Sequence, residues 1–142
     1  MTMSLSRRAA LVALMVAGVS GWSFNALAQE VISGSGSGFP GQTVPITIEY
    51  DPGTLFLAAN VDATISFDAS LYASVNVVNC FAANGCTVDE GAGTIDISVN
   101  VESANGPVDL AVIDFVIDPG AAAGQVDDLI VSATFSDQLG SP

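Results

Sequence analysis

Apolar and polar residues alternate with a period of two along most of the chain after residue 30, as expected for β-strands that bury one face. The alternation is clearest in residues 44–50, 60–67 and 94–101, where every second position holds Val, Ile, Ala, Phe or Tyr. Pro45 lacks a backbone N–H, so the first of these strands should place it at a sheet edge or near the strand start.

Further strands are predicted at residues 31–32, 73–78, 87–88, 108–117 and 125–135, separated by turn sequences such as Asp-Pro-Gly and Asn-Gly-Pro. The segment 108–117 is apolar enough to be buried on both faces near its centre. Only residues 55–59 and 121–123 could form short helical turns, because a 3.6-residue period never persists. These features predict an all-β fold, an antiparallel β-sandwich of the jelly-roll or immunoglobulin-like kind.

The N-terminal residues 1–28 have the features of a secretory signal peptide. Arg7 and Arg8 precede 11 apolar residues at 9–19, and Ala-Leu-Ala at 26–28 predicts cleavage after Ala28. A membrane anchor is the alternative, but a span needs roughly 20 apolar residues. A twin-arginine signal is incomplete, with Ala10 where a bulky residue is usual, so ordinary export is favoured. We expect a secreted or periplasmic protein.

Removing 28 of the 142 residues leaves 114, enough for one domain at residues 29–142. Within it, residues 34–41 (GSGSGFPG) resemble a flexible linker. The domain keeps all 15 acidic residues and neither basic one. Nucleic acid and anionic lipid are therefore excluded as partners by repulsion, and the rest of the chain offers no membrane span. With no His or Lys, imidazole and amine catalysis are excluded too.

Two cysteines, Cys80 and Cys86, enclose an Asn-Gly turn that can bring them together. An oxidising compartment favours a disulfide between them, stabilising the fold by roughly 2 kcal/mol. A redox or metal pair is the alternative, but the spacing is not CxxC and no His or third Cys is present.

Several segments, taken in order, resemble a cohesin domain, the β-sandwich module of cellulosome scaffolds and related exported proteins. They are residues 40–46 (PGQTVPI), 61–68 (VDATISFD), Leu71, 93–95 (GTI), 112–117 (VIDFVI), 121–124 (AAAG) and 134–137 (TFSD). The resemblance implies a non-catalytic module that binds a dockerin-like protein in a polysaccharide-degradation or cell-surface context. The family's contact residues vary, so it assigns no binding residue here.

Cohesin domains usually continue for one more strand after the segment that resembles residues 134–137. This chain stops at Pro142, so we expect the sandwich to lack its last strand and to leave a sheet edge unpaired.

Carboxylates are the only ionisable catalytic groups, so an extracellular hydrolase acting through two of them is a further alternative. The candidate pairs are Asp89 with Glu90, Asp127 with Asp128, and Asp114 with Asp118. Most lie in turns, where acidic residues are favoured for conformational reasons, and no motif frames a cleft. We therefore assign no catalytic residue.

Calcium is the one cofactor to weigh, because turn carboxylates suit a hard cation. The candidates are Asp51, Asp89, Glu90, Asp118, Asp127, Asp128 and Asp137. No D-x-D-x-D-G loop is present, and solubility is the simpler reason for the acidic residues, so we expect no cofactor.

A carbohydrate-binding β-sandwich is the main alternative function. Sugars stack on flat aromatic platforms, but the only Trp, Trp22, lies in the signal segment, and Tyr50 and Tyr72 are separate. The favoured hypothesis is a protein-binding module, followed by a polysaccharide-binding domain and then a hydrolase.

Overall fold

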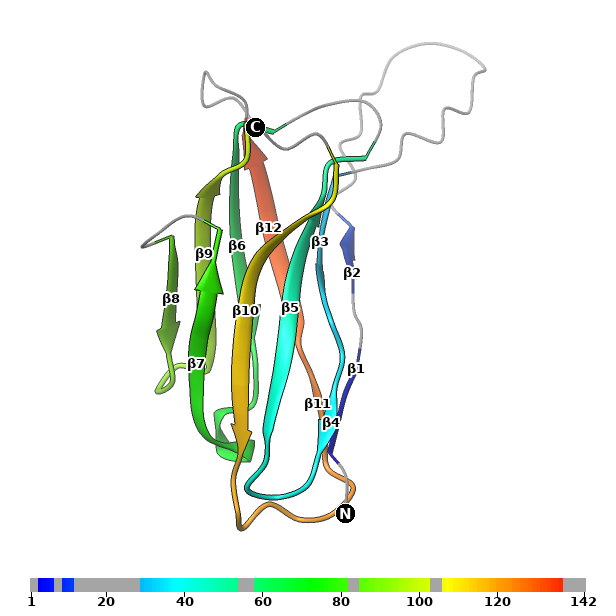
Figure 1. Cartoon of the computed structure of the whole chain (residues 1–142), viewed down its shortest axis with the longest axis vertical. Helices are drawn as coiled ribbons and strands as arrows, with labels where there is room; N and C mark the ends of the chain where they lie inside the picture. The colour runs from blue at the N-terminus through cyan, green and yellow to red at the C-terminus, as the bar shows by residue number, and fades with distance from the viewer. Residues whose placement is uncertain are drawn as a thin grey trace, which may run out of the picture.

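Two antiparallel β-sheets pack face to face, and the core lies between them (Figure 1). The computed structural model describes residues 3–6, 9–11, 29–53, 58–81, 85–102 and 106–136. Nearly all of its regular structure is strand, so the all-β prediction is confirmed.

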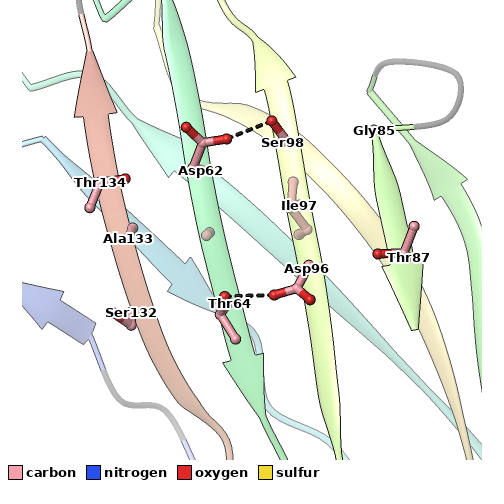
Figure 2. Close-up of a pocket in the computed structure, with 11 residues that line it drawn as sticks. Asp62, Thr64, Gly85, Thr87, Asp96, Ile97, Ser98, Ser132, Ala133 and Thr134 are labelled. Atoms are coloured by element: carbon pink, nitrogen blue, oxygen red, sulfur yellow. Dashed lines mark hydrogen bonds between the residues drawn. The ribbon is translucent and has the colours of Figure 1, made fainter. Parts of the chain in front are cut away.

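The five-stranded sheet has the order β2 (Ala9–Leu11), β3 (Glu30–Ser33), β5 (Thr43–Asp51), β10 (Val108–Ile117), β7 (Tyr72–Cys80). The four-stranded sheet, part of which Figure 2 shows, has the order β12 (Ile130–Ser136), β6 (Asn60–Ser66), β9 (Thr94–Asn100), β8 (Cys86–Asp89). A small third sheet places β1 (Met3–Ser6) between β11 (Val126–Asp128) and β4 (Ser37–Gly38). Each of the predicted strands is present.

The predicted strand at 125–135 is two strands rather than one, so that prediction is wrong in detail. Leu129, which is fully buried, separates β11 from β12. β11 pairs with β1 in the small sheet, whereas β12 pairs with β6 along its whole length. The chain therefore changes sheets at Leu129.

Of the two positions predicted for Pro45, the strand start is the one that the structure shows. β5 is an inner strand between β3 and β10, so Pro45 is not on an edge strand. It does lie near the start of β5, before the stretch from Ile48 to Asp51 that pairs with β3. A residue without an N–H is tolerated there because no β3 residue pairs with it.

The expectation that residues 108–117 are buried on both faces is wrong. Leu110, Ile113 and Phe115 are fully buried, but Val112 and Asp114 are only half-buried on the other side of β10. The outer face of the five-stranded sheet meets solvent, as antiparallel sheets commonly do.

The glycine-rich segment 34–41 is not a flexible linker. Gly34 donates its N–H to the Thr47 carbonyl at 2.7 Å, and Ser37–Gly38 forms β4. A Cβ on Gly38 would lie 2.8 Å from a Val44 methyl carbon and 3.0 Å from Ile117 Cδ1. Glycine is needed here for the close approach of the backbone to the core, not for flexibility.

The one helical turn in the described residues is a 3₁₀ turn, η1 (Ala69–Leu71), at a place where no helical turn is predicted. Asp68 caps it by accepting the Ser70 N–H at 3.0 Å. The alternative turn at 121–123 does not form, and residues 54–57 lie outside the described residues.

An aromatic cluster fills one end of the core. The rings of Phe67 and Phe115 meet edge to face with centroids 5.6 Å apart, and Tyr72 lies 4.9 Å from Phe115. These residues come from the loop after β6, from β10 and from β7, so the contacts join the two sheets. Such aromatic pairs add about 1 kcal/mol each beyond their buried area.

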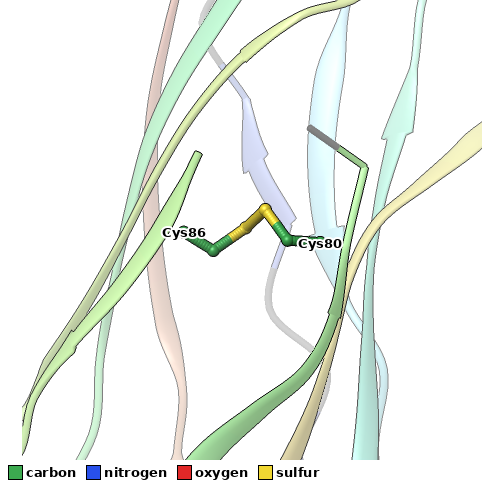
Figure 3. Close-up of a disulfide and its surroundings, with 2 residues drawn as sticks. All are labelled: Cys80 and Cys86. Carbon is green, nitrogen blue, oxygen red and sulfur yellow. A yellow bond between two sulfur atoms is a disulfide. The ribbon is translucent and has the colours of Figure 1, made fainter. Parts of the chain in front are cut away.

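A disulfide joins Cys80 and Cys86, as the sequence predicts (Figure 3). Cys80 ends β7 and Cys86 begins β8, and these are edge strands of different sheets. The bond therefore closes one side of the sandwich covalently, in addition to stapling a short loop.

Replacing both cysteines by serine should lower the free energy of unfolding by about 2 kcal/mol, because the unfolded chain regains loop entropy. The melting temperature should fall by on the order of 8 °C. Thermal unfolding with and without reductant checks this. Reductant should lower the melting temperature of the natural protein and leave the double variant unchanged. An equal response of both would contradict the prediction.

Candidate functional site

The outward side of the four-stranded sheet carries a regular array of small polar side chains, which we call the polar face (Figure 2). It is formed by Asp62, Thr64, Thr87, Asp96, Ser98, Ser132 and Thr134. The same strands direct Ala63, Ile97 and other apolar side chains into the core. Successive side chains of a strand point to opposite sides of the sheet, so burial of the apolar residues turns the polar residues between them outward.

Strand register aligns these side chains in rows across the sheet. In one row Ser132 pairs with Thr64, Thr64 with Asp96, and Asp96 with Thr87, crossing all four strands. The Thr64 hydroxyl donates to Asp96 Oδ1 at 2.6 Å. This hydrogen bond orients the Asp96 carboxylate.

The adjacent row repeats the arrangement with donor and acceptor strands exchanged. Thr134 pairs with Asp62, and Asp62 with Ser98. The Ser98 hydroxyl donates to Asp62 Oδ1 at 2.5 Å. Each carboxylate is thus oriented by a hydroxyl from the neighbouring strand, which reduces the entropy that binding would cost.

These residues line a shallow hollow of about 410 Å³ that extends to Gly85 beside β8. Its lining has two carboxylates, several hydroxyls and neither an aromatic nor a basic side chain. Such a surface can accept hydrogen bonds from Lys, Arg and hydroxyl groups of a partner.

Asp89 and Glu90, one of the predicted carboxylate pairs, serve the turn between β8 and β9. Asp89 Oδ1 accepts the Ala92 N–H at 2.9 Å, closing the turn. Glu90 Oε1 accepts the Val75 N–H of β7 at 2.7 Å. Both carboxylates therefore hold backbone in place, as turn residues commonly do.

Asp114 and Asp118 do not form a pair either. Asp114 lies on the outer face of the five-stranded sheet, in register with Pro45 and Asn76. Asp118 lies in the turn after β10 and accepts the Gly120 N–H at 2.6 Å. Across the described residues, no group of three or more acidic or cysteine side chains is arranged to hold a metal, and Asp137 lies outside them.

Asp127, on β11, is a buried carboxylate that is only 6% exposed. Its Oδ2 accepts the Tyr72 hydroxyl at 2.9 Å and the Asp68 N–H at 3.1 Å. Burial raises the pKa of Asp127, and the two hydrogen bonds oppose the rise. Burial and the Asp127 charge together raise the pKa of Tyr72.

A buried carboxylate with a shifted pKa is a common mark of an active site. Asp127 lies instead under the sandwich end, tying β11 to β7 and to the cap of η1, and is not among the residues that line the hollow. Its partner Asp128 points outward and is exposed. We therefore interpret Asp127 as a structural latch.

Aromatic side chains do not form a sugar-binding platform in the part of the chain that the structure describes. Tyr50 is fully buried and Tyr72 is 8% exposed. The exposed rings, Phe39 and Phe81, lie beside β4 and at the end of β7, in different sheets. Within the same residues, no helix has the length and apolarity needed to cross a membrane.

No protein-family model matches the sequence, and no curated protein matches it. Solved structures with a similar fold include the CaDoc0917–CaCohA2 complex, at 24% identity and a TM-score of 0.53 over 73% of this chain and 83% of that one. The sixth cohesin of scaffoldin B from Acetivibrio cellulolyticus, in complex with a Cel5 dockerin, matches at 20% identity and a TM-score of 0.53, covering 74% and 83% of the two chains.

The third cohesin of ScaC from the same organism, in complex with the ScaB dockerin, matches at 15% identity and a TM-score of 0.54, covering 68% and 77%. At these identities the similarity concerns the fold. The chain therefore has a cohesin-like jelly-roll β-sandwich fold, as the sequence resemblance predicted.

The polar face is not apparent from the sequence alone. Alternation puts Asp62 and Thr64 on the polar side of one predicted strand, and Asp96 and Ser98 on the polar side of another. Both strands carry Asp, Ser or Thr at their polar positions, and that pattern was the available signal. Only the pairing of β6 with β9 shows that the polar residues of the two strands are neighbours.

Replacing Asp127 by Asn should flatten the pH dependence of stability. A folded-state pKa raised above 3.8 gives stability that is present at low pH and lost as pH rises through the folded pKa. The Asn oxygen can still accept the Tyr72 hydroxyl and the Asp68 N–H. Urea unfolding at pH 4 and pH 7 measures this: relative to the natural protein, the free energy of unfolding of the variant should be higher at pH 7 than at pH 4.

Asp109→Asn is the matched control, since it removes an exposed carboxylate from β10. It should leave the change in urea midpoint between the two pH values close to that of the natural protein. If Asp127→Asn behaves like this control, the latch interpretation is wrong.

Proposed function

We propose that this protein is an exported, non-catalytic interaction module whose polar face binds a dockerin-like protein. The observation that carries the proposal is the pair of oriented carboxylates, Asp62 and Asp96, at the centre of a solvent-facing sheet. The cohesin-like fold supports it, because the structural neighbours are cohesins in complex with dockerins.

Charge indicates what the partner presents. Beyond residue 28 the chain has 15 acidic and no basic residues, so its own surface cannot neutralise the polar face. A partner with Lys or Arg opposite Asp62 and Asp96 would form charge-assisted hydrogen bonds and associate faster at low salt. Small Ser and Thr side chains between the carboxylates allow a helix or strand of the partner to approach closely.

Export is the second part of the proposal. It is supported by the leader-like residues 1–28 and by the disulfide, which persists in oxidising compartments. The folded domain would then comprise residues 29–142, secreted or periplasmic. A polysaccharide-degradation or cell-surface context follows from the cohesin-like fold as an expectation.

The alternatives receive no specific support from the geometry. A carbohydrate-binding role would need an aromatic platform, and the described tyrosines are buried. The hydrolase hypothesis rested on carboxylate pairs that include Asp89, Asp118 and Asp127, and these three side chains hold turns or the sandwich end.

Replacing Asp62 and Asp96 together by Asn should weaken dockerin binding by on the order of 100-fold, about 10-fold for each charge. Asn keeps an acceptor for Ser98 and Thr64, so the fold should persist. Isothermal titration of the natural protein and the variant against a panel of dockerins measures the effect.

Asp109→Asn, on the outer face of the five-stranded sheet, should bind as tightly as the natural protein. Binding of no dockerin by the natural protein would contradict the proposed function. Equal losses in the double variant and in Asp109→Asn would remove the polar face as the site.

A further inference from the structure

The leader-like segment occupies a strand position in the folded domain. β1 lies between β11 and β4, with three residue pairs to β11 and two to β4. A strand that is paired on both sides is an inner strand. Without it, β11 and β4 would be separated by a gap one strand wide, about 10 Å across.

The same segment continues along the five-stranded sheet. β2 pairs with β3 through Ala9 with Ile32, Ala10 with Val31 and Leu11 with Glu30. β3 has β5 as its other neighbour. β1 and β2 thus lie along β11, β4 and β3, and we call the strand position that they occupy the edge slot (Figure 1).

Export would empty this slot, so the inference rests on the export part of the proposed function. Cleavage after Ala28 removes β1 and β2 together and makes Glu30 the second residue of the exported chain. The outward backbone groups of β3, β4 and β11 would then lose their partners. Unpaired edges of this kind pair readily with another extended chain.

Apolar side chains mark the border of the slot. Phe39, Val126 and Ile130 are 48%, 56% and 58% exposed, and they are among five large apolar residues exposed in the described chain. Val126 is in register with Ser4 of β1, and Phe39 follows the β4 residue that pairs with Met3. The exposed apolar side chains beside β4 and on β11, Phe39 and Val126, favour an apolar occupant.

The acidic border indicates the occupant's charge. Asp128 lies in register with Ser6, and Glu30 lies between Leu11 and Asp51 across the sheet. A second copy of the exported domain would bring only further negative charge, because it has no basic residue. The segment that fills the slot here carries Arg7 and Arg8 in its sequence.

We propose that the exported domain is a strand acceptor, whose edge slot takes an extended, basic and apolar segment from another exported protein. The occupant adds as a β-strand through its backbone, so affinity comes from main-chain hydrogen bonds and the flanking charges and apolar contacts select the sequence. The slot lies on the opposite side of the sandwich from the disulfide between β7 and β8, and it is separate from the residues of the polar face.

The test uses the protein purified after export, with its N-terminus established by intact mass. The probe is a synthetic peptide with the sequence of residues 3–11, MSLSRRAAL. Saturating peptide should raise the melting temperature by several degrees. Hydrogen exchange should show new protection in β3 and β11 and none on the polar face.

Two control peptides separate backbone pairing from charge. Proline in place of Ala10 removes an N–H and should weaken binding at least 10-fold. Glutamate in place of both arginines should also weaken binding, and only the arginine peptide should lose affinity as salt rises. On the acceptor, Val126→Glu should weaken binding several-fold without changing the melting temperature of the peptide-free protein.

Failure of this proposal is distinguishable from failure of the dockerin proposal. The double variant Asp62→Asn, Asp96→Asn should bind the peptide as well as the natural protein does. No stabilisation by the peptide, or protection confined to the polar face, would overturn the strand-acceptor proposal. So would an exported protein that retains residues 1–28, because the slot would then be filled within the chain.

Discussion

Burial of one side of each sheet against the other is the constraint on which this structure depends. Phe115 and Ile113 of β10 and Ile65 and Ile97 of the facing sheet are almost completely buried. Because side chains alternate along a strand, burying these positions turns every intervening residue outward. On the four-stranded sheet the intervening residues are Asp, Ser and Thr, so the polar face is the outer counterpart of the core.

The chain has to fold with almost no opposite charge to pair its carboxylates. Its carboxylates accept hydrogen bonds from backbone N–H groups and hydroxyls instead. Asp89 and Asp118 accept N–H groups that close turns. Glu90 accepts an N–H of β7, and Asp127 accepts the Tyr72 hydroxyl. Such hydrogen bonds satisfy a carboxylate without a cation. They also explain why acidic pairs that are adjacent in sequence do not form catalytic pairs in space. The remaining negative surface favours a basic partner for either of the two proposed binding regions.

The two long sides of the sandwich are closed by different means. Between β7 and β8 the closure is covalent, through Cys80 and Cys86. Along β3, β4 and β11 the closure is made by β1 and β2, which belong to the leader-like residues 1–28. A covalent closure survives processing of the N-terminus, whereas the strand closure would be removed with the leader.

The sequence alone determined the strands, the sandwich class and the disulfide, because each depends on neighbours within a few residues: alternation at 94–101, the Asn-Gly turn before Cys86, and Asp-Pro-Gly breaks. Only the tertiary structure decided which strands are neighbours, and strand pairing is not encoded locally. Strand register placed Asp62 beside Ser98 and Thr64 beside Asp96. The tertiary structure also packed Gly36 and Gly38 against Val44 and split 125–135 at Leu129. The polar face is built by hydrogen bonds between residues more than 30 positions apart, and these contacts arise only when the sheet forms.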